Sequence, residues 1–164
     1  MGGSERVSAG ILLWRRAADG APEVLLAHPG GPYFAHRDAG AWGIPKGEPE
    51  PGEELPAVAL RELREETGVV AEGPLVPLGD IVQKGGKRVH AWACRGDLDP
   101  ADHVSITCRI EWPPGSGRRI EIPEVDRVAW FGLHEAKQRI RDRQAPFIDR
   151  LAVLLAIGPE EEMA

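Results

Sequence analysis

The stretch from Gly47 to Val69, GEPEPGEELPAVALRELREETGV, decides how this chain is interpreted. Its second part predicts a helix from Leu55 to Thr67. Pro56 suits a first turn, the middle is rich in helix-forming residues, and Gly68 is placed to end the helix. The periodicity of a helix then determines which of its side chains face the protein interior.

The carboxylates of this predicted helix fall on its apolar side. At roughly 100° per residue, positions seven apart lie nearly above one another. The three glutamates are Glu62, Glu65 and Glu66, and the residues seven positions before them are Leu55, Val58 and Ala59. The side predicted to face solvent carries Ala57, Arg61 and Arg64. An ordinary amphipathic helix places its carboxylates opposite the apolar face.

Three carboxylates crowded beside a core face repel one another and lose hydration. Two outcomes relieve this repulsion: the pKa values rise until a carboxylate is protonated, or a hard divalent cation binds among the oxygens. The alternative interpretation is plain solvated charge, which Arg-Glu-Glu triplets usually represent. The position of these glutamates on the apolar side argues against it.

The segment before the helix is suited to approach a ligand. The run from Gly43 to Gly47 can bring backbone amides close to a bound group, and prolines at 45, 49 and 51 reduce the entropy lost on ordering it. Glu53 falls at the helix entrance. It is either part of the same site or a favourable charge at the N-terminal end of the helix dipole.

Taken together, the stretch resembles the Nudix box, G-x5-E-x7-R-E-U-x-E-E-x-G-U with U apolar. All nine defined positions match, over 23 residues. The similarity extends to Ser8 to Leu12, to Trp42 to Gly47 and to Val125 to Phe131, and so covers most of residues 6–140. The resemblance implies an α/β fold, an α/β/α sandwich with a central mixed β-sheet.

The same resemblance implies metal-dependent hydrolysis of a phosphoanhydride (pyrophosphate) bond in a nucleoside diphosphate linked to a further group. Mg²⁺ is the expected cofactor, with Mn²⁺ as a substitute. By position, the metal ligands are Glu62, Glu65 and Glu66, and the catalytic residues are Glu65, Arg61, Glu53 and Glu124. Arg61 would orient a carboxylate, Glu53 in our interpretation.

The resemblance further implies that the general base is Glu65 or an acidic residue about six positions before Trp130. That residue is Glu124, with Glu121 as the nearby substitute.

The substrate is suggested by the run Trp42 to Gly47, which resembles the W-x-x-P-K-G of dinucleoside polyphosphate and diphosphoinositol hydrolases. A dinucleoside polyphosphate is therefore the favoured substrate. The alternatives are a house-cleaning nucleoside triphosphate pyrophosphohydrolase and a non-catalytic nucleotide-sensing module, which an eroded box would favour. Lys46, Arg118 and Arg119 are candidate phosphate ligands, or else solvated surface charge.

Outside the box the pattern predicts further elements. Strands are expected at 6–15, 23–27, 75–83, 88–95, 104–111 and 125–131, helices near 134–141 and 146–157, and loops at 28–52 and 112–119. We expect one domain over residues 1–164 with a frayed tail at 158–164. Tyr33, Phe34, Trp92 and Trp112 are candidates for base stacking, although core or rim positions are the simpler interpretation.

Composition narrows the functional class. A chain with 42% apolar and 28% charged residues is ordinary globular protein, and its longest apolar run, Leu151 to Ile157, is too short to span a membrane. We therefore expect a cytoplasmic protein without a membrane partner. The net charge of −6 argues against binding a nucleic acid duplex. Two cysteines predict no disulfide framework, and the oligomeric state is not predicted.

Overall fold

The computed structural model describes residues 5–157. The tail expected at 158–164 lies outside the described residues. The central feature is a six-stranded sheet in the order β4-β5-β1-β2-β8, with β3 paired to β1. Its strands are β1 (Val7–Arg16), β2 (Pro22–Pro29), β3 (Lys46–Gly47), β4 (Val76–Val82), β5 (Arg88–Arg95) and β8 (Val125–Gly132). β1 and β5 are parallel and the other neighbours antiparallel, so the sheet is mixed.

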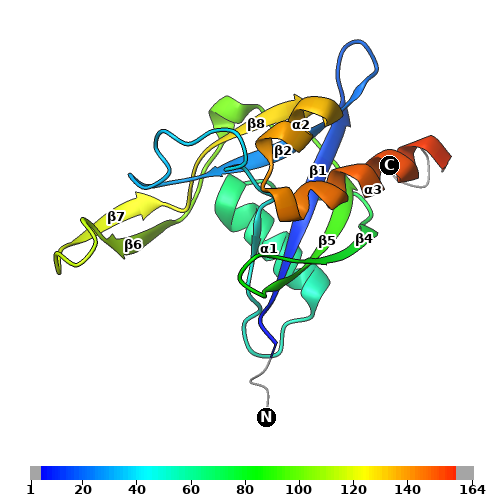
Figure 1. Ribbon diagram of the computed structural model, residues 1–164. Coiled ribbons are helices and arrows are strands. Elements are labelled where there is room, and N and C mark those ends of the chain that lie inside the picture. The colour runs from blue at the N-terminus through cyan, green and yellow to red at the C-terminus, as the bar shows by residue number, and fades with distance from the viewer. Residues whose placement is uncertain (1–4, 158–164) are drawn as a thin grey trace.

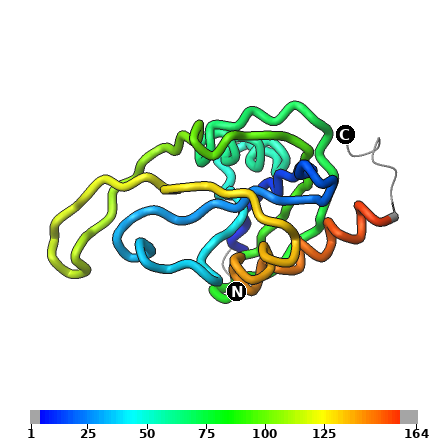
Figure 2. The backbone as a smooth tube through the Cα atoms, turned by 90° about the horizontal axis from the view of Figure 1, so that it is seen from above, coloured from blue at the N-terminus to red at the C-terminus, as the bar shows by residue number. Residues whose placement is uncertain are grey.

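Helices cover both faces of this sheet. α1 (Leu55–Thr67) lies on one face, and α2 (Leu133–Arg139) and α3 (Ala145–Ile157) lie on the other (Figures 1 and 2). Each interface has its own apolar core, one including Val58 and Leu63 of α1, the other Phe147 and Leu151 of α3. The predicted α/β/α sandwich is confirmed. No helix within residues 5–157 combines the length and apolar character needed to traverse a bilayer.

The central strand β1 explains how the box is placed. Residues Ser8 to Trp14 are all buried, as expected for a strand covered on both faces. One end of β1 pairs with β2, and the other pairs with β3, where Ala9 lies opposite Gly47. This pairing holds the first glycine of the box against the sheet, directly under α1.

The segment from 104 to 123 differs from the prediction in two respects. The strand predicted at 104–111 begins only at Thr107, because the amides of Val104 and Ile106 donate to carbonyls at the end of α1 instead of to a strand. A strand that we did not predict, β7 (Arg119–Pro123), pairs with β6 (Thr107–Glu111) in a separate hairpin that projects from the sandwich (Figure 1).

The segments around the long loop also differ in detail. β2 continues to Pro29, and the loop predicted at 28–52 contains β3. α2 ends at Arg139, two residues earlier than predicted, because the amide of Arg141 donates to the carbonyl of Trp42 at 2.8 Å. The end of α2 is therefore tied to the loop that leads into the box.

A buried glutamine strengthens this connection. Gln144 is 1% exposed, its Oε1 accepts from the amide of Ile44 at 3.0 Å, and its Nε2 donates to Oε1 of Gln83 at 3.0 Å. Gln144 thus fixes the residues that precede β3, and through them the entrance to the box.

Substitution of Gln144 by Leu tests this role. The variant leaves the buried amide of Ile44 without an acceptor, which costs about 1–3 kcal/mol of the free energy of unfolding. Urea denaturation should show that loss. The matched control is Gln138→Leu at an exposed position of α2, where we expect a change within about 0.5 kcal/mol. Equal stability of the two variants would contradict the assignment.

Candidate active site

The site is built around a carboxylate packed against a glycine. Glu62 is only 8% exposed, and a Cβ atom added at Gly47 would overlap its carboxylate. Any other residue at position 47 would displace the Glu62 side chain. The glycine of the box is therefore required because a charged group lies against the backbone of β3.

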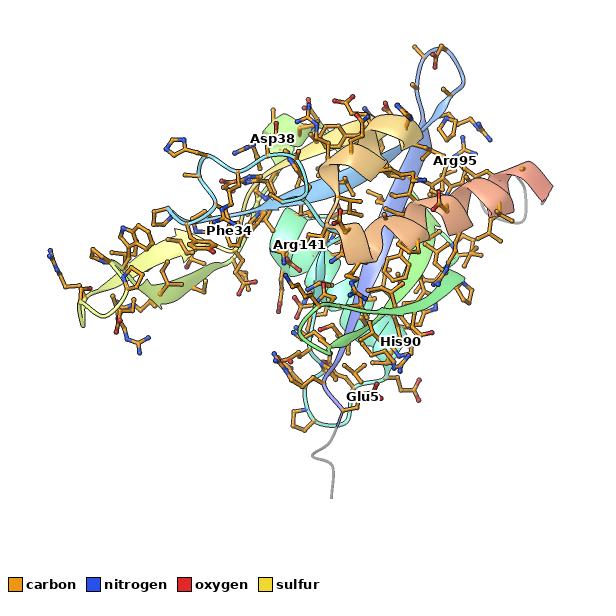
Figure 3. All side chains as sticks on the ribbon, in the orientation of Figure 1. Glu5, Phe34, Asp38, His90, Arg95 and Arg141 are labelled. Atoms are coloured by element: carbon orange, nitrogen blue, oxygen red, sulfur yellow. The ribbon has the colours of Figure 1, made fainter. Side chains whose placement is uncertain are left out.

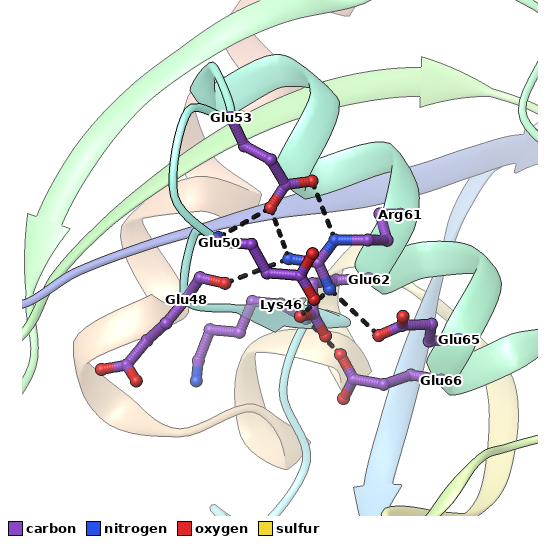
Figure 4. Close-up of polar contacts among 8 residues, drawn as sticks. All are labelled: Lys46, Glu48, Glu50, Glu53, Arg61, Glu62, Glu65 and Glu66. Atoms are coloured by element: carbon purple, nitrogen blue, oxygen red, sulfur yellow. Dashed lines mark hydrogen bonds and ion pairs between the residues drawn. The ribbon is translucent and has the colours of Figure 1, made fainter.

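Arg61 connects the acidic residues. Its Nε and Nη2 donate to the two oxygens of Glu53 at 2.9 and 2.8 Å, and its Nη1 donates to Glu62 at 2.9 Å and Glu65 at 3.1 Å (Figure 4). We predicted that Arg61 faces solvent, and this was wrong. The side chain folds back over the helix until it is 15% exposed, because three carboxylates attract it.

The bidentate contact has a clear electrostatic effect on Glu53. The Arg61 guanidinium, helped by the backbone amide of Glu50, lowers the pKa of Glu53 to about 2. The paired carboxylates in turn raise the pKa of Arg61. Glu53 is a fixed anion, and the position predicted from the resemblance, beside Arg61, is the one the structure shows.

Glu66 has the opposite character. It accepts a hydrogen bond from the amide of Lys46 at 2.8 Å, yet its pKa rises to about 9, because it is buried and lies near the charges of Glu62 and Glu124. Burial also raises the pKa of Glu62, which shares a hydrogen bond with Glu66. Without a cation, the cluster therefore retains a proton at neutral pH.

Glu124 completes the acidic group from a distant part of the chain. It lies between β7 and β8, and its carbonyl accepts from the amide of Gly30 at 3.0 Å. Burial and the charges of Glu62 and Glu65 raise its pKa. The alternative, Glu121, accepts from the hydroxyl of Thr107 on the exposed β6–β7 hairpin, which identifies Glu124 as the acid near the box.

The donor set fits a hard divalent cation. Only carboxylate oxygens are offered, and their negative charge is incompletely balanced. Across residues 5–157, however, no three acidic, histidine or cysteine side chains converge in a ready-made metal site. The reason is visible in the hydrogen bonds: Arg61 holds Glu62 and Glu65, and the Lys46 amide holds Glu66. Binding an ion requires these oxygens to turn.

A cavity of about 140 Å³ opens beside the glutamates. Its polar lining residues are Lys46, Glu66, Glu124, Arg141 and Gln144. Burial and the charge of Lys87 lower the pKa of Lys46, so its ammonium group is poorly solvated next to the acids. Lys46 thus lines the cavity together with Glu66 and Glu124.

The other candidate phosphate ligands lie elsewhere. Arg118 and Arg119 are exposed on the β6–β7 hairpin and do not line this cavity. The structure does not bring them to the glutamates.

A second cavity adjoins the first. It has a volume of about 450 Å³, and its lining includes Tyr33, Phe34, Arg37, Ala41 and Arg141. The rings of Tyr33 and Phe34 meet edge to face at 4.9 Å, and the Arg37 guanidinium lies 4.4 Å from the centre of Tyr33. Two of the four aromatic residues named as stacking candidates, Tyr33 and Phe34, thus line a cavity next to the acids.

Sequence reasoning missed the residues that shape these cavities from outside the box. Arg141 lay in a predicted helix and Gln144 next to one, with no local motif to distinguish them. His28 is fully buried, and its ring nitrogens are hydrogen-bonded to Asp126 at 2.9 Å and to the carbonyl of Arg37 at 2.6 Å. His28 therefore anchors the loop that carries Tyr33 and Phe34. The His28–Asp126 and Gln144–Ile44 contacts join positions about 100 residues apart, which a local pattern does not reveal.

Replacement of Glu66 by Gln tests the buried charge. Because the pKa of Glu66 rises from 4.5 to about 9 on folding, the folded protein binds a proton that the unfolded chain releases between those values. The free energy of unfolding of the metal-free protein should therefore fall as pH rises through this range. Glu66→Gln should lose that dependence and melt at a higher temperature than the parent at pH 8. For a chain of this size, each 1 kcal/mol gained in the free energy of unfolding raises the melting temperature by about 2–4 °C.

Calorimetry with EDTA and then with excess Mg²⁺ provides the measurement. Magnesium should raise the melting temperature of the parent more than that of Glu66→Gln. Glu54→Gln, at an exposed position without a side-chain capping bond, is the control and should behave like the parent. If the parent and Glu66→Gln have the same pH dependence, the buried charge is wrongly assigned.

The chain is similar in sequence to named hydrolases. An 8-oxo-(d)GTP phosphatase of Mycolicibacterium smegmatis is 35% identical over 115 residues, which cover 65% of this chain and 34% of that protein. An RNA pyrophosphohydrolase of Novosphingobium aromaticivorans is 48% identical over 54 residues, covering 30% of this chain and 34% of that protein. The matches span about a third of the length of these curated relatives.

Solved structures show the same fold. An Ap4A hydrolase of C. elegans, in a binary complex, has a TM-score of 0.64 and 20% identity, covering 91% of this chain and 98% of that one. The NUDIX domain of Shewanella oneidensis NrtR, complexed with ADP ribose, has a TM-score of 0.64 and 18% identity, covering 93% and 90%. A family model described as NUDIX domain matches residues 4–151, and members of this family generally require a divalent metal ion. The chain belongs to the NUDIX family.

Proposed function

We propose that this protein hydrolyses a phosphoanhydride bond in a nucleoside diphosphate linked to a further group, with Mg²⁺, or Mn²⁺ in its place, held by Glu62, Glu65 and Glu66. One observation carries the proposal. Buried carboxylates with raised pKa values lie beside a cavity that Lys46 and Arg141 also line. Carboxylates can hold a divalent cation, and Lys46 and Arg141 can contact phosphate oxygens. The site therefore suits a phosphate substrate that binds together with a metal ion.

Each residue has a distinct task in this mechanism. Bound Mg²⁺ would neutralise phosphate oxygens and lower the pKa of a water molecule. Arg61 supports Glu62 and Glu65 from one side and is itself held by Glu53. Lys46 would contact a phosphate oxygen and balance charge that develops during attack on phosphorus. The residues that line the cavity would hold the anhydride in position for attack by water.

Glu124 is the better candidate for the general base. Within the described part of the chain its carboxylate makes no hydrogen bond, whereas Glu65 accepts one from Arg61 at 3.1 Å. The raised pKa of Glu124 also brings its proton affinity closer to neutral pH. Glu65 remains the alternative, since it is a proposed metal ligand at the same site.

Among substrates we favour a dinucleoside polyphosphate, on the resemblance of the run from Trp42 to Gly47 and on the second cavity next to the glutamates. A nucleoside triphosphate is the second candidate, because the relative that matches 65% of this chain is named an 8-oxo-(d)GTP phosphatase. A nucleotide sensor is the third candidate. The intact box argues against it.

Removal of one proposed metal ligand tests the hydrolytic function. Glu62→Gln should reduce turnover by on the order of 100-fold or more and shift the Mg²⁺ requirement to higher concentration. Release of phosphate or pyrophosphate from a nucleotide panel, with products separated by chromatography, is the measurement. Glu54→Gln should retain the parent rate. Near-normal turnover by Glu62→Gln would remove the metal model, and tight nucleotide binding without any turnover by the parent would favour a sensor.

The base is tested by pH–rate profiles. Glu124→Gln should lower kcat by on the order of 10²–10⁴-fold and flatten the acidic limb of the profile, because the group that must lose a proton is gone. In Glu65→Gln that limb should persist at a reduced rate. The reverse result, a flat limb in Glu65→Gln alone, would assign the base to Glu65.

A further inference from the structure

Arg141 is a cation whose backbone is fixed while its guanidinium has no anionic partner among the described residues 5–157. Its amide donates to the carbonyl of Trp42 at 2.8 Å, and its carbonyl accepts from the amide of Gln144 at 2.9 Å. Arg139, two residues earlier, is by contrast paired, since it donates to Asp38 at 2.6 Å. Within residues 5–157 the Arg141 guanidinium makes no hydrogen bond or ion pair, and it lies 5.7 Å from the centre of the Phe34 ring (Figure 3).

A second cation lies close to Arg141. The charge of Arg141 contributes to the lowered pKa of Lys46, and both residues line the cavity of about 140 Å³ beside Glu66. Two like charges that face one shared space repel each other, and an anion between them relieves that repulsion. Glu66 lines the same cavity and partly offsets the charge of Lys46, whereas the Arg141 guanidinium has no hydrogen-bonded anion within residues 5–157 and is available to a phosphate group.

Arg141 also occupies the junction between cavities. It lines both the cavity beside the glutamates and the cavity of about 450 Å³ that Tyr33 and Phe34 also line. Ala41 is the other residue that lines both cavities. A third cavity, of about 370 Å³, is lined by Arg141 together with Lys84 and Arg143. A molecule that extends from the glutamates into the second cavity must pass Arg141.

We propose that Arg141 binds a phosphate group beyond the anhydride that is cleaved, and thereby selects substrates with three or more consecutive phosphates over diphosphates that end in neutral groups. The inference rests on the proposed function, which places the reacting anhydride at the glutamates. A planar guanidinium donates two parallel hydrogen bonds to phosphate, which a lysine ammonium does not reproduce. Arg141 is a specificity-determining residue in this account, and the glutamates perform the reaction.

The test compares Arg141→Gln with the parent on diadenosine tetraphosphate, ATP and ADP-ribose, all with Mg²⁺. For the two polyphosphates we expect kcat/KM to fall roughly 10- to 100-fold, mainly through a higher KM. This is the range expected for the loss of a charge-assisted hydrogen bond. For ADP-ribose the change should stay within about 3-fold. Arg141→Lys should lie between the parent and Arg141→Gln on the polyphosphates, because it keeps the charge but not the planar fork.

Arg143→Gln is the matched control. It removes one positive charge two residues from Arg141, and Arg143 lines only the third cavity. It should leave both substrate classes nearly unchanged. Equal losses in Arg143→Gln and Arg141→Gln would indicate long-range attraction and overturn the contact. If Arg141→Gln lost kcat/KM equally on ADP-ribose and on the polyphosphates, the role of Arg141 would be structural. If Arg141→Gln lost no kcat/KM on the polyphosphates, Arg141 would not contact the substrate.

The outcomes separate this inference from the proposed function. If the parent cleaves the panel and Arg141→Gln shows no selective loss, only the inference fails. If the parent cleaves none of the three substrates, the proposed function fails. Equilibrium binding of the three nucleotides, with Ca²⁺ in place of Mg²⁺, gives a readout independent of turnover and should show the same selective loss for Arg141→Gln.

Discussion

The whole site depends on the burial of carboxylates between one turn of α1 and the backbone of β3. Glu62 lies against Gly47 because β3 is paired with β1 and α1 packs over the same sheet. Burial of charge is unfavourable unless partners compensate it. Gly47, the guanidinium of Arg61 and the amide of Lys46, which directly precedes the box, all meet that requirement at once.

Without metal, Arg61 holds three of the acidic side chains through hydrogen bonds. Repulsion among the acids is relieved in three ways: by the guanidinium, by a proton held near Glu66 and, in our proposal, by a divalent ion. The first two exist without metal, and each keeps the oxygens from converging on one point. An arriving ion therefore competes with a proton and an arginine, which links metal affinity to pH.

The sequence allowed prediction of α1 and its glutamates because helical periodicity is local: Glu62 is buried, as counting from Leu55 indicated. The sandwich and the choice of Glu124 as a candidate base were predicted from family resemblance. The fold-back of Arg61 was missed because the position of a Cβ on a helix does not determine where a long side chain ends. β7 and the junction at Arg141 were missed because both depend on pairings with distant segments.

The most direct test of the central claim is the number of protons released when Mg²⁺ binds. Calorimetric titration at pH 7.5 in two buffers of different ionisation enthalpy measures it. Because the pKa of Glu66 is about 9 in the metal-free protein, our account predicts release of about one proton for each ion bound. Binding heats that are identical in both buffers would show that the site was already fully ionised and would contradict the account.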